Sequence, residues 1–310
     1  MCGIYGFYQY KNAVPCKALE KIIESLALAN IDRGKDSSGQ AIIEKDNKIH
    51  VIKKLGDAKH YYRHPKIREG LRNHFRQTPK AILGHTRAAT TGEVNLMNAQ
   101  PFIYGDIVGT HNGIIWNYHE KFIEHKLKPL TKCDSEIIFA LLSTASDNKA
   151  RAKLLSECSG YLAIAYLDQA KPDSVHLASV NNESLYAFNT PYGIFWSSIR
   201  KSLKKTLRRH GIKGIEIDIP LGEIVTIGED KSIRREVIPC EIWQVNSMPY
   251  NYPTVYRHQS DDINRICDNC YELSYEPLNF KVITGYGICR KCERIYFSDY
   301  KEDKRYWRGV

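Results

Sequence analysis

The cysteine at position 2, directly behind the initiator methionine, is the side chain best placed for nucleophilic chemistry. Removal of Met1, which the small Cys2 side chain permits, would leave a thiol and a free α-amine on one residue. A free α-amine titrates at about pH 7.7–8.0, so it can accept the thiol proton near neutral pH without a separate histidine. Gly3 leaves the approach to the sulfur open. The alternative is that Cys2 is only a small residue after the start codon, and these residues alone do not decide.

Five further short motifs follow Cys2, and each has an ordinary structural explanation when taken alone. An arginine in a loop can form a salt bridge, an Asn-Gly pair is a common turn, and an aspartate at a helix start can cap the helix. The motifs in chain order are Arg33-Gly34-x-Asp36-Ser37-x-Gly39, Gly84-His85-Thr86-Arg87, Asn98-Ala99-Gln100-Pro101-Phe102, His111-Asn112-Gly113 and Asp134-Ser135-Glu136.

Together with Cys2-Gly3-Ile4, this set resembles the class II glutamine amidotransferases in order and approximate spacing, over roughly residues 2–238. The resemblance is greatest to the glutaminase domains of amidophosphoribosyltransferase and glucosamine-6-phosphate synthase. It implies an α+β chain with the N-terminal nucleophile hydrolase fold, in which two antiparallel sheets lie between helical layers in an αββα order. It also implies that Cys2 attacks the side-chain amide of glutamine while its own α-amine moves the proton.

The resemblance assigns roles to four more residues, and their chemistry suits those roles. Asn112 and Gly113 would hold the tetrahedral oxyanion, because an amide donor beside an unobstructed backbone donor is what an oxyanion hole requires. Arg87 would bind the substrate α-carboxylate through its planar fork, and Asp134 would pair with the α-ammonium group. One cation and one anion in a shared pocket fit a zwitterionic amino acid.

The loop residues around these positions have lesser expected roles. Thr90 and Thr91 are candidates for hydroxyl or backbone contacts to the substrate carboxylate. We interpret Arg33, Asp36 and Ser37 as mainly structural residues that shape the loop beside the nucleophile.

Three positions depart from the relatives. Ala88 and Thr91 stand where glucosamine-6-phosphate synthases carry Trp and His, and Gln100 stands where they carry a second His. These departures concern the flexible glutamine loop and its coupling to an acceptor more than the nucleophile.

Hydrophobic periodicity predicts the elements that must position these groups. A first strand begins behind Cys2, and an amphipathic helix spans 17–30. Further strands are predicted at 40–44, 49–53, 81–86, 107–111, 162–167, 175–179, 185–189, 193–197 and 223–227. Further helices are predicted at 65–76, 114–126, 134–143 and 199–209, and the Asn112-Gly113 pair is predicted to be a turn.

The charge and length of the chain limit the possible functions. Of the formal charge of +10 over 310 residues, none comes from 240–310, where ten Lys/Arg face ten Asp/Glu. The basic stretches 59–76 and 200–209 make nucleic acid a possible partner, although a solvated helix face explains the second stretch as well. The sequence has no run of about 18 apolar residues and no signal pattern, so we expect a cytoplasmic protein without a membrane partner.

The C-terminal segment predicts a metal site. Two Cys-x-x-Cys pairs, Cys267 with Cys270 and Cys289 with Cys292, have the spacing of a four-cysteine zinc ribbon. Four thiolates close a tetrahedral site, so the expected zinc is structural. We therefore divide the chain into a glutaminase domain at 2–239, a linker at 240–262 and a zinc-ribbon-like tail at 263–310. The aromatic residues of the tail favour a protein interface over a nucleic-acid surface.

About 70 residues after the glutaminase domain are too few for a second catalytic domain. We therefore expect the ammonia acceptor to be a separate synthase subunit, with nucleotide or nucleic-acid modification as one possible use. Two alternatives stay open at this point. The chain could be an inactive scaffold that acts through its zinc ribbon, or a hydrolase of another amide.

Overall fold

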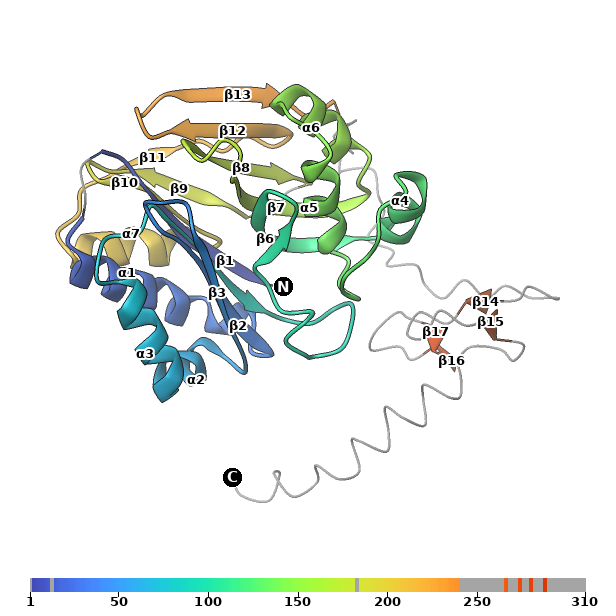
Figure 1. Cartoon of the computed structure of the whole chain (residues 1–310), viewed down its shortest axis with the longest axis horizontal. Coiled ribbons are helices and arrows are strands. Elements are labelled where there is room, and N and C mark those ends of the chain that lie inside the picture. Colours follow the sequence, from blue (N-terminus) through green and yellow to red (C-terminus); the bar gives the residue numbers. More distant parts are fainter. Residues whose placement is uncertain are drawn as a thin grey trace, which may run out of the picture. The chain divides into compact units, whose positions relative to one another are not determined.

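The computed structural model describes residues 2–11, 14–181 and 184–239, together with the backbone of four two-residue strands in the C-terminal segment (Figure 1). The chain divides into two compact units, Met1–Val245 and Asn246–Val310, and each is described by itself.

The first sheet carries the nucleophile. It has seven strands in the order β11-β9-β10-β1-β4-β2-β3, and each pair of neighbours is antiparallel. The strands are β1 (Gly3–Gln9), β2 (Ser37–Ile43), β3 (Ile49–Leu55), β4 (Ala81–Arg87), β9 (Tyr186–Asn189), β10 (Gly193–Ser197) and β11 (Ile215–Ile217). β1 lies at the centre, between β4 and β10, and its first residue, Gly3, is paired with Thr86 of β4, which fixes the position of Cys2 in front of it.

The second sheet has six antiparallel strands in the order β13-β12-β8-β7-β6-β5. They are β5 (Phe102–Tyr104), β6 (Ile107–Ile115), β7 (Gly160–Asp168), β8 (Ser174–Val180), β12 (Glu223–Gly228) and β13 (Ile233–Val237).

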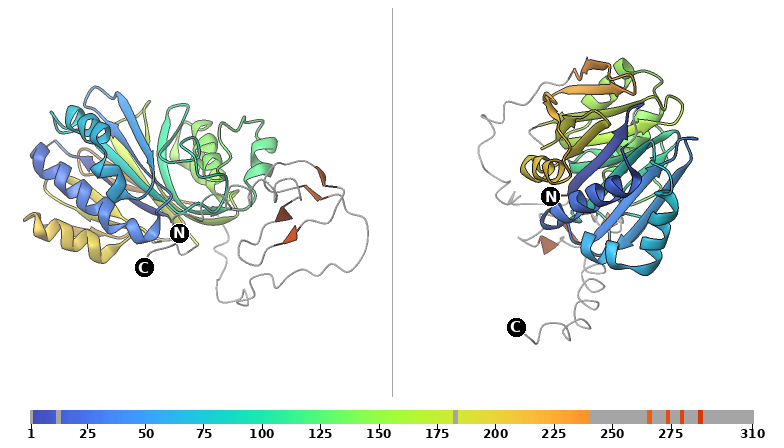
Figure 2. Two further views of the ribbon diagram at one scale, coloured as in Figure 1. Left: turned by 90° about the horizontal axis from the view of Figure 1, so that it is seen from below. Right: turned by 90° about the vertical axis from the view of Figure 1, so that its left-hand side faces the viewer.

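Three apolar clusters show how the layers pack. One joins the first sheet to helices α1, α2, α3 and α7, a second joins the second sheet to α4, α5 and α6, and a third fills the space between the sheets (Figure 2). The helices are α1 (Cys16–Ala29), α2 (Ala58–Arg63), α3 (Pro65–His74), α4 (Tyr118–Glu124), α5 (Glu136–Ser143), α6 (Asn148–Ser156) and α7 (Arg200–Arg209), with a 3-10 turn η1 (Ile31–Arg33) after α1. This is the layer order that the resemblance implies.

Two predicted elements near the site were wrong. Asn112 and Gly113 are not a turn, because β6 continues through both to Ile115 and pairs with β7 along its whole length. The residues that follow were predicted to be helical from 114, but α4 begins only at Tyr118. Local Asn-Gly chemistry was overridden here by nine consecutive strand pairings.

A buried ion pair ties α6 to the second sheet. Arg151 donates to Asp168 at 2.6 Å, both side chains are 4% exposed, and the Arg151 Nε also donates to the Leu142 and Ala145 carbonyls. The pair closes the end of the α5–α6 hairpin.

We expect Arg151→Met to lower the free energy of unfolding by about 3–5 kcal/mol, because it leaves the Asp168 carboxylate buried without its cation. Urea unfolding followed by circular dichroism measures the change. Arg200→Met is the matched control, since the Arg200–Glu216 pair is exposed and solvent screens it, so its loss should change the free energy of unfolding much less. Equal losses in the two variants would contradict the prediction.

The C-terminal unit is described only as two small antiparallel pairs. β14 (Arg265–Ile266) pairs with β15 (Leu273–Ser274), and β16 (Asn279–Phe280) pairs with β17 (Gly287–Ile288). The predicted zinc ligands Cys267, Cys270, Cys289 and Cys292 and the linker at 240–262 lie outside the described residues. Within the part of the chain that is described, none of the helices has the length and apolar character needed to cross a membrane.

Candidate active site

Cys2 lies directly before β1 and is buried, with 8% of its surface exposed. Its sulfur lies 3.4 Å from both the backbone nitrogen and the carbonyl oxygen of Ala88, the first residue after β4. Burial raises the pKa of the thiol, while the Ala88 backbone and the charge of Arg87 lower it and the charge of Asp134 raises it. A base is therefore needed to generate the thiolate, which is the role that sequence analysis gave to the α-amine.

The loop beside Cys2 is held by two residues that we interpreted as structural. Arg33 donates from Nε to the Cys2 carbonyl at 2.8 Å, and the Asp36 carboxylate accepts from the Ala89 backbone at 2.7 Å. Ser37 is buried at the start of β2. These contacts agree with the interpretation, because they fix both the backbone of Cys2, which carries the sulfur, and the backbone of Ala89, next to the residue that the sulfur contacts.

Arg87, the last residue of β4, is 2% exposed, and its guanidinium donates to the loop that follows. It bonds the carbonyls of Thr91 at 2.6 Å, Glu93 at 3.0 Å and Gly92 at 3.4 Å. A substrate carboxylate would have to share or replace these carbonyl contacts. The role of Arg87 in binding glutamine therefore stays a prediction, linked to the conformation of residues 91–93.

Thr90 and Thr91 lie on this same loop, which is more open to solvent than the strands around it. Thr90 is exposed and Thr91 is partly buried. The far end of the loop is anchored by Asn98, which donates to the Glu93 carbonyl and accepts from the Lys132 backbone, both at 2.9 Å. This second anchor joins the loop to the segment that carries Asp134.

Asp134 is 2% exposed and does not cap α5; instead its Oδ2 accepts from the Ile115 backbone at 2.8 Å. Burial raises the pKa of this carboxyl to about 6, against smaller lowering effects of the Ile115 bond and the Arg87 charge. An ammonium group brought beside Asp134 would relieve part of that cost of burial. The carboxylate is thus well suited to the cationic end of an amino acid.

Asn112 and Gly113 lie in β6, opposite Ala163 and Leu162 of β7. Asn112 is fully buried, and Gly113 has a φ of 145°. A Cβ at position 113 would lie 1.8 Å from the Tyr161 carbonyl oxygen. Only glycine fits this position, whether or not its N–H binds an oxyanion.

Gly113→Ala is expected to lower the free energy of unfolding by more than the about 1–3 kcal/mol that backbone strain alone costs, because the clash with Tyr161 adds to the strain. Denaturant unfolding measures it. Gly211→Ala is the control, since Gly211 also has a positive φ, 69°, but its added Cβ would have nothing within 4 Å. A loss no larger than that of Gly211→Ala would contradict the clash.

Two buried histidines, which sequence analysis did not single out, connect the site elements. His85 of β4 lies with Nε2 3.1 Å from the His111 carbonyl, and His111 lies with Nδ1 2.8 Å from the Ser135 hydroxyl. Burial lowers the pKa of His85 to about 3 and that of His111 to about 4, so both are neutral at pH 7. Their presence inside two of the motifs was the available signal.

Lys53 of β3 is a further unexpected group. Its ammonium lies 5.3 Å from the centre of the Phe102 ring, and burial lowers its pKa to about 8, while the charge of Cys133 opposes this. A lysine in an edge strand gives no such signal in the sequence.

Comparison with known proteins identifies the family. The family model described as "Glutamine amidotransferases class-II" matches residues 32–204. A 7-cyano-7-deazaguanine synthase of Saccharolobus solfataricus is 33% identical over 197 residues, which are 60% of this chain and 40% of that protein. A glutamine–fructose-6-phosphate aminotransferase (isomerizing) of Staphylococcus aureus is 30% identical over 228 residues, which are 71% of this chain and 36% of that protein.

A solved structure shows the same fold. The glutamine phosphoribosylpyrophosphate amidotransferase of B. subtilis, in complex with ADP and GMP, superposes with a TM-score of 0.59 at 18% identity, over 78% of this chain and 50% of that one. The chain thus spans half or less of the length of each of these relatives. The residues 32–204 matched by the family model contain all five motifs that follow Cys2. The chain belongs to the class II glutamine amidotransferase family.

Proposed function

We propose that this protein hydrolyses L-glutamine to L-glutamate and ammonia with Cys2 as its nucleophile. The observation that carries the proposal is the position of the Cys2 sulfur, which lies buried against Ala88 where the charges of Arg87 and Asp134 both act on it. A nucleophile, a cation and an anion are therefore close together. That is the set that a glutaminase needs for a zwitterionic substrate.

In the proposed reaction the Cys2 thiol gives its proton to its own α-amine and attacks the side-chain carbonyl carbon of glutamine. The resulting oxyanion accepts hydrogen bonds from the Asn112 amide and the Gly113 backbone N–H. Collapse breaks the carbon–nitrogen bond, and the leaving nitrogen takes the proton from the α-amine and departs as ammonia. Water then attacks the thioester, which releases glutamate and restores the thiol.

The substrate would be held at its other end by Arg87 on the α-carboxylate and Asp134 on the α-ammonium, with Thr90 and Thr91 beside the carboxylate. For this the guanidinium must release at least part of its bonding to the carbonyls of 91–93. The loop that follows β4, at residues 91–97, would then close over bound glutamine. Such closure would couple substrate binding to the conformation of this loop.

The ammonia acceptor is proposed to be a synthase on a separate polypeptide. The matches to this chain cover 40% and 36% of two curated relatives, one of which is named as a 7-cyano-7-deazaguanine synthase. That name supports a nucleotide base, free or in nucleic acid, as the final acceptor. The C-terminal cysteines Cys267, Cys270, Cys289 and Cys292 are proposed to hold a structural zinc ion. A cytoplasmic location is proposed for the protein.

The test is release of glutamate and ammonia in equal amounts from glutamine by protein whose N-terminus is shown by intact mass to be Cys2. Asparagine, one methylene shorter, is the control substrate. Release of glutamate and ammonia from glutamine, with no ammonia released from asparagine, supports the proposal. No release from correctly processed protein, alone or with an ammonia-accepting synthase, would leave the scaffold function instead.

A further inference from the structure

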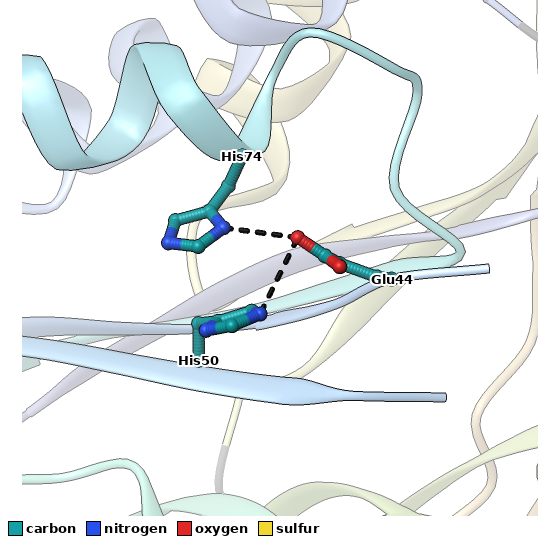
Figure 3. Close-up of side chains that lie close together, drawn as sticks. All are labelled: Glu44, His50 and His74. Carbon is teal, nitrogen blue, oxygen red and sulfur yellow. Dashed lines mark hydrogen bonds and ion pairs between the residues drawn. The ribbon is translucent and has the colours of Figure 1, made fainter. Parts of the chain in front are cut away.

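A cluster of two histidines and one glutamate lies at the β2–β3 turn and the C-terminal end of α3, at positions that play no part in the glutamine site described above. Glu44 directly follows β2, His50 lies in β3, and His74 is the last residue of α3. One oxygen of Glu44 lies 3.0 Å from Nδ1 of His74 and 3.3 Å from Nε2 of His50 (Figure 3). Three elements thus direct three potential ligand atoms to one point.

The cluster is partly buried and open enough for an ion to enter. The side chains are 34% exposed for Glu44 and His50 and 20% for His74. Nε2 of His50 is shielded from solvent and makes no hydrogen bond within the described residues, although it faces the Glu44 oxygen. A buried nitrogen without a hydrogen bond is costly unless another partner can reach it. A metal ion is such a partner.

A second cluster of the same kind gives an internal comparison. Among the described residues, Glu124, His125 and Glu157 also bring three ligand atoms together. There, however, the Lys121 ammonium already lies 2.6 Å from Glu124 and 3.7 Å from Glu157. A cation is built into that cluster, and an added metal ion would be repelled by it.

No lysine or arginine of the described residues lies within ion-pair distance of Glu44, although the charge of Lys48, which pairs with Asp46, acts on it from farther away. Within 2–11, 14–181 and 184–239 its ion pairs are those with the two histidines, which are neutral unless protonated. The cluster therefore offers one carboxylate and two imidazoles as ligand groups.

We propose that Glu44, His50 and His74 bind one divalent transition-metal ion, such as Zn²⁺, with at least one coordination position left to water. Two histidines and one carboxylate are an established ligand set for such ions. Ligands about 2.0–2.1 Å from zinc lie about 3.3–3.4 Å apart in a tetrahedron. The Glu44 oxygen lies 3.0 and 3.3 Å from the two nitrogens, and all three atoms lie within 4.8 Å of one another. This inference does not depend on the proposed glutaminase activity.

Binding requires a limited rearrangement of the two imidazoles. Their rings are stacked with centroids 3.9 Å apart and an angle of 26° between planes. Each ring must turn so that its plane points to the ion, and its proton must lie on the other nitrogen, Nε2 of His74 and Nδ1 of His50. The bound ion would then connect the β2–β3 hairpin to the end of α3.

The experiment titrates Co²⁺ into metal-free, full-length protein and follows the absorption spectrum. Cobalt bound by cysteine thiolates gives an intense near-ultraviolet charge-transfer band, whereas cobalt bound by histidine and carboxylate gives only weak visible bands. The spectrum thus separates the proposed site from the tail cysteines. We expect the wild type to bind one more equivalent of Co²⁺ than His74→Asn does. The spectrum of this additional Co²⁺ should lack the thiolate charge-transfer band.

Two further variants make the result decisive. His50→Asn must also lose the equivalent, which guards against a folding defect caused by one substitution, and circular dichroism in EDTA checks that both variants fold. His125→Asn, in the cluster that contains Lys121, must retain it. Equal stoichiometry in wild type and His74→Asn would overturn the proposal and leave the cluster as an ion pair only. Affinity weaker than about 100 μM would mark adventitious surface binding and overturn it as well.

Discussion

Cys2→Ala is expected to reduce glutamate release from glutamine by about 10³-fold or more, since removal of a catalytic nucleophile leaves only the contribution of substrate binding. Cys2 is buried against Ala88, so the small change in volume should leave the fold intact. Steady-state assay beside intact-mass analysis and a thermal unfolding curve measures both effects. Cys16→Ala is the matched control, because Cys16 is another free thiol, near Thr78 and away from the site, and its loss should leave activity unchanged.

A second variant tests the base and not only the nucleophile. Insertion of a large residue between Met1 and Cys2 blocks removal of Met1 and converts the Cys2 amine into an amide. The sulfur remains but loses its proton acceptor, and burial keeps its pKa high. We expect activity to fall about as far as in Cys2→Ala. Full activity in this variant would show that another group is the base.

The central strands and the long helices could be predicted because their patterns are strong. Buried strands such as β1, β4 and β7 are near-continuous apolar or small-residue runs, and α1 carries apolar residues at helical spacing. Short elements were missed. The helices α2 and α6 and the edge strands β5, β11 and β13 have few buried residues or few residues altogether, so their tertiary contacts and not their local pattern decide the structure.

The region around Gly113 shows why local turn chemistry misled the prediction. An Asn-Gly pair usually marks a two-residue turn because both residues tolerate positive φ. Here the same tolerance lets Gly113 pass beside the Tyr161 carbonyl while β6 stays paired with β7. The backbone conformation that favours a turn in an isolated Asn-Gly pair here permits a close approach of two paired strands.

The residues of the candidate site could be proposed from motif order, but their bonding could not be predicted. No spacing rule could show that the Arg87 guanidinium bonds its own loop at Thr91 and Glu93, or that Asp134 accepts from Ile115. Glu44, His50 and His74 are spread over three elements with no metal-ligand spacing in the sequence. Their proximity arises from the packing of α3 on the β2–β3 hairpin.

Asp134→Asn is expected to weaken glutamine binding while it stabilises the free protein. Loss of a buried partner for the α-ammonium should cost about 2–5 kcal/mol, which is a fall in kcat/KM of at least about thirtyfold. The asparagine oxygen can still accept from Ile115, so the local structure is retained. Asp106→Asn, on an exposed side chain in the β5–β6 turn, is the matched control and should change neither property.

The stability effect has a defined sign and pH window. Burial raises the pKa of Asp134 from 3.8 to about 6, so between these values the folded protein holds a proton that the unfolded chain has released. Stability from this group is therefore present below about pH 4 and is lost as pH rises through about 6. Above that pH Asp134→Asn should unfold less readily than the wild type, by on the order of 1–3 kcal/mol.

The same titration predicts the pH dependence of binding. As pH falls below about 6, Asp134 takes up a proton and its attraction for the ammonium group is lost, so KM for glutamine should rise in the wild type but not in Asp134→Asn. Kinetics from pH 5 to 8, with unfolding curves over the same range, measure both effects. An unchanged KM in Asp134→Asn would show that Asp134 does not bind the substrate. A loss of stability in Asp134→Asn above pH 6 would show that the wild-type Asp134 carboxylate is paired with a cation in the free protein.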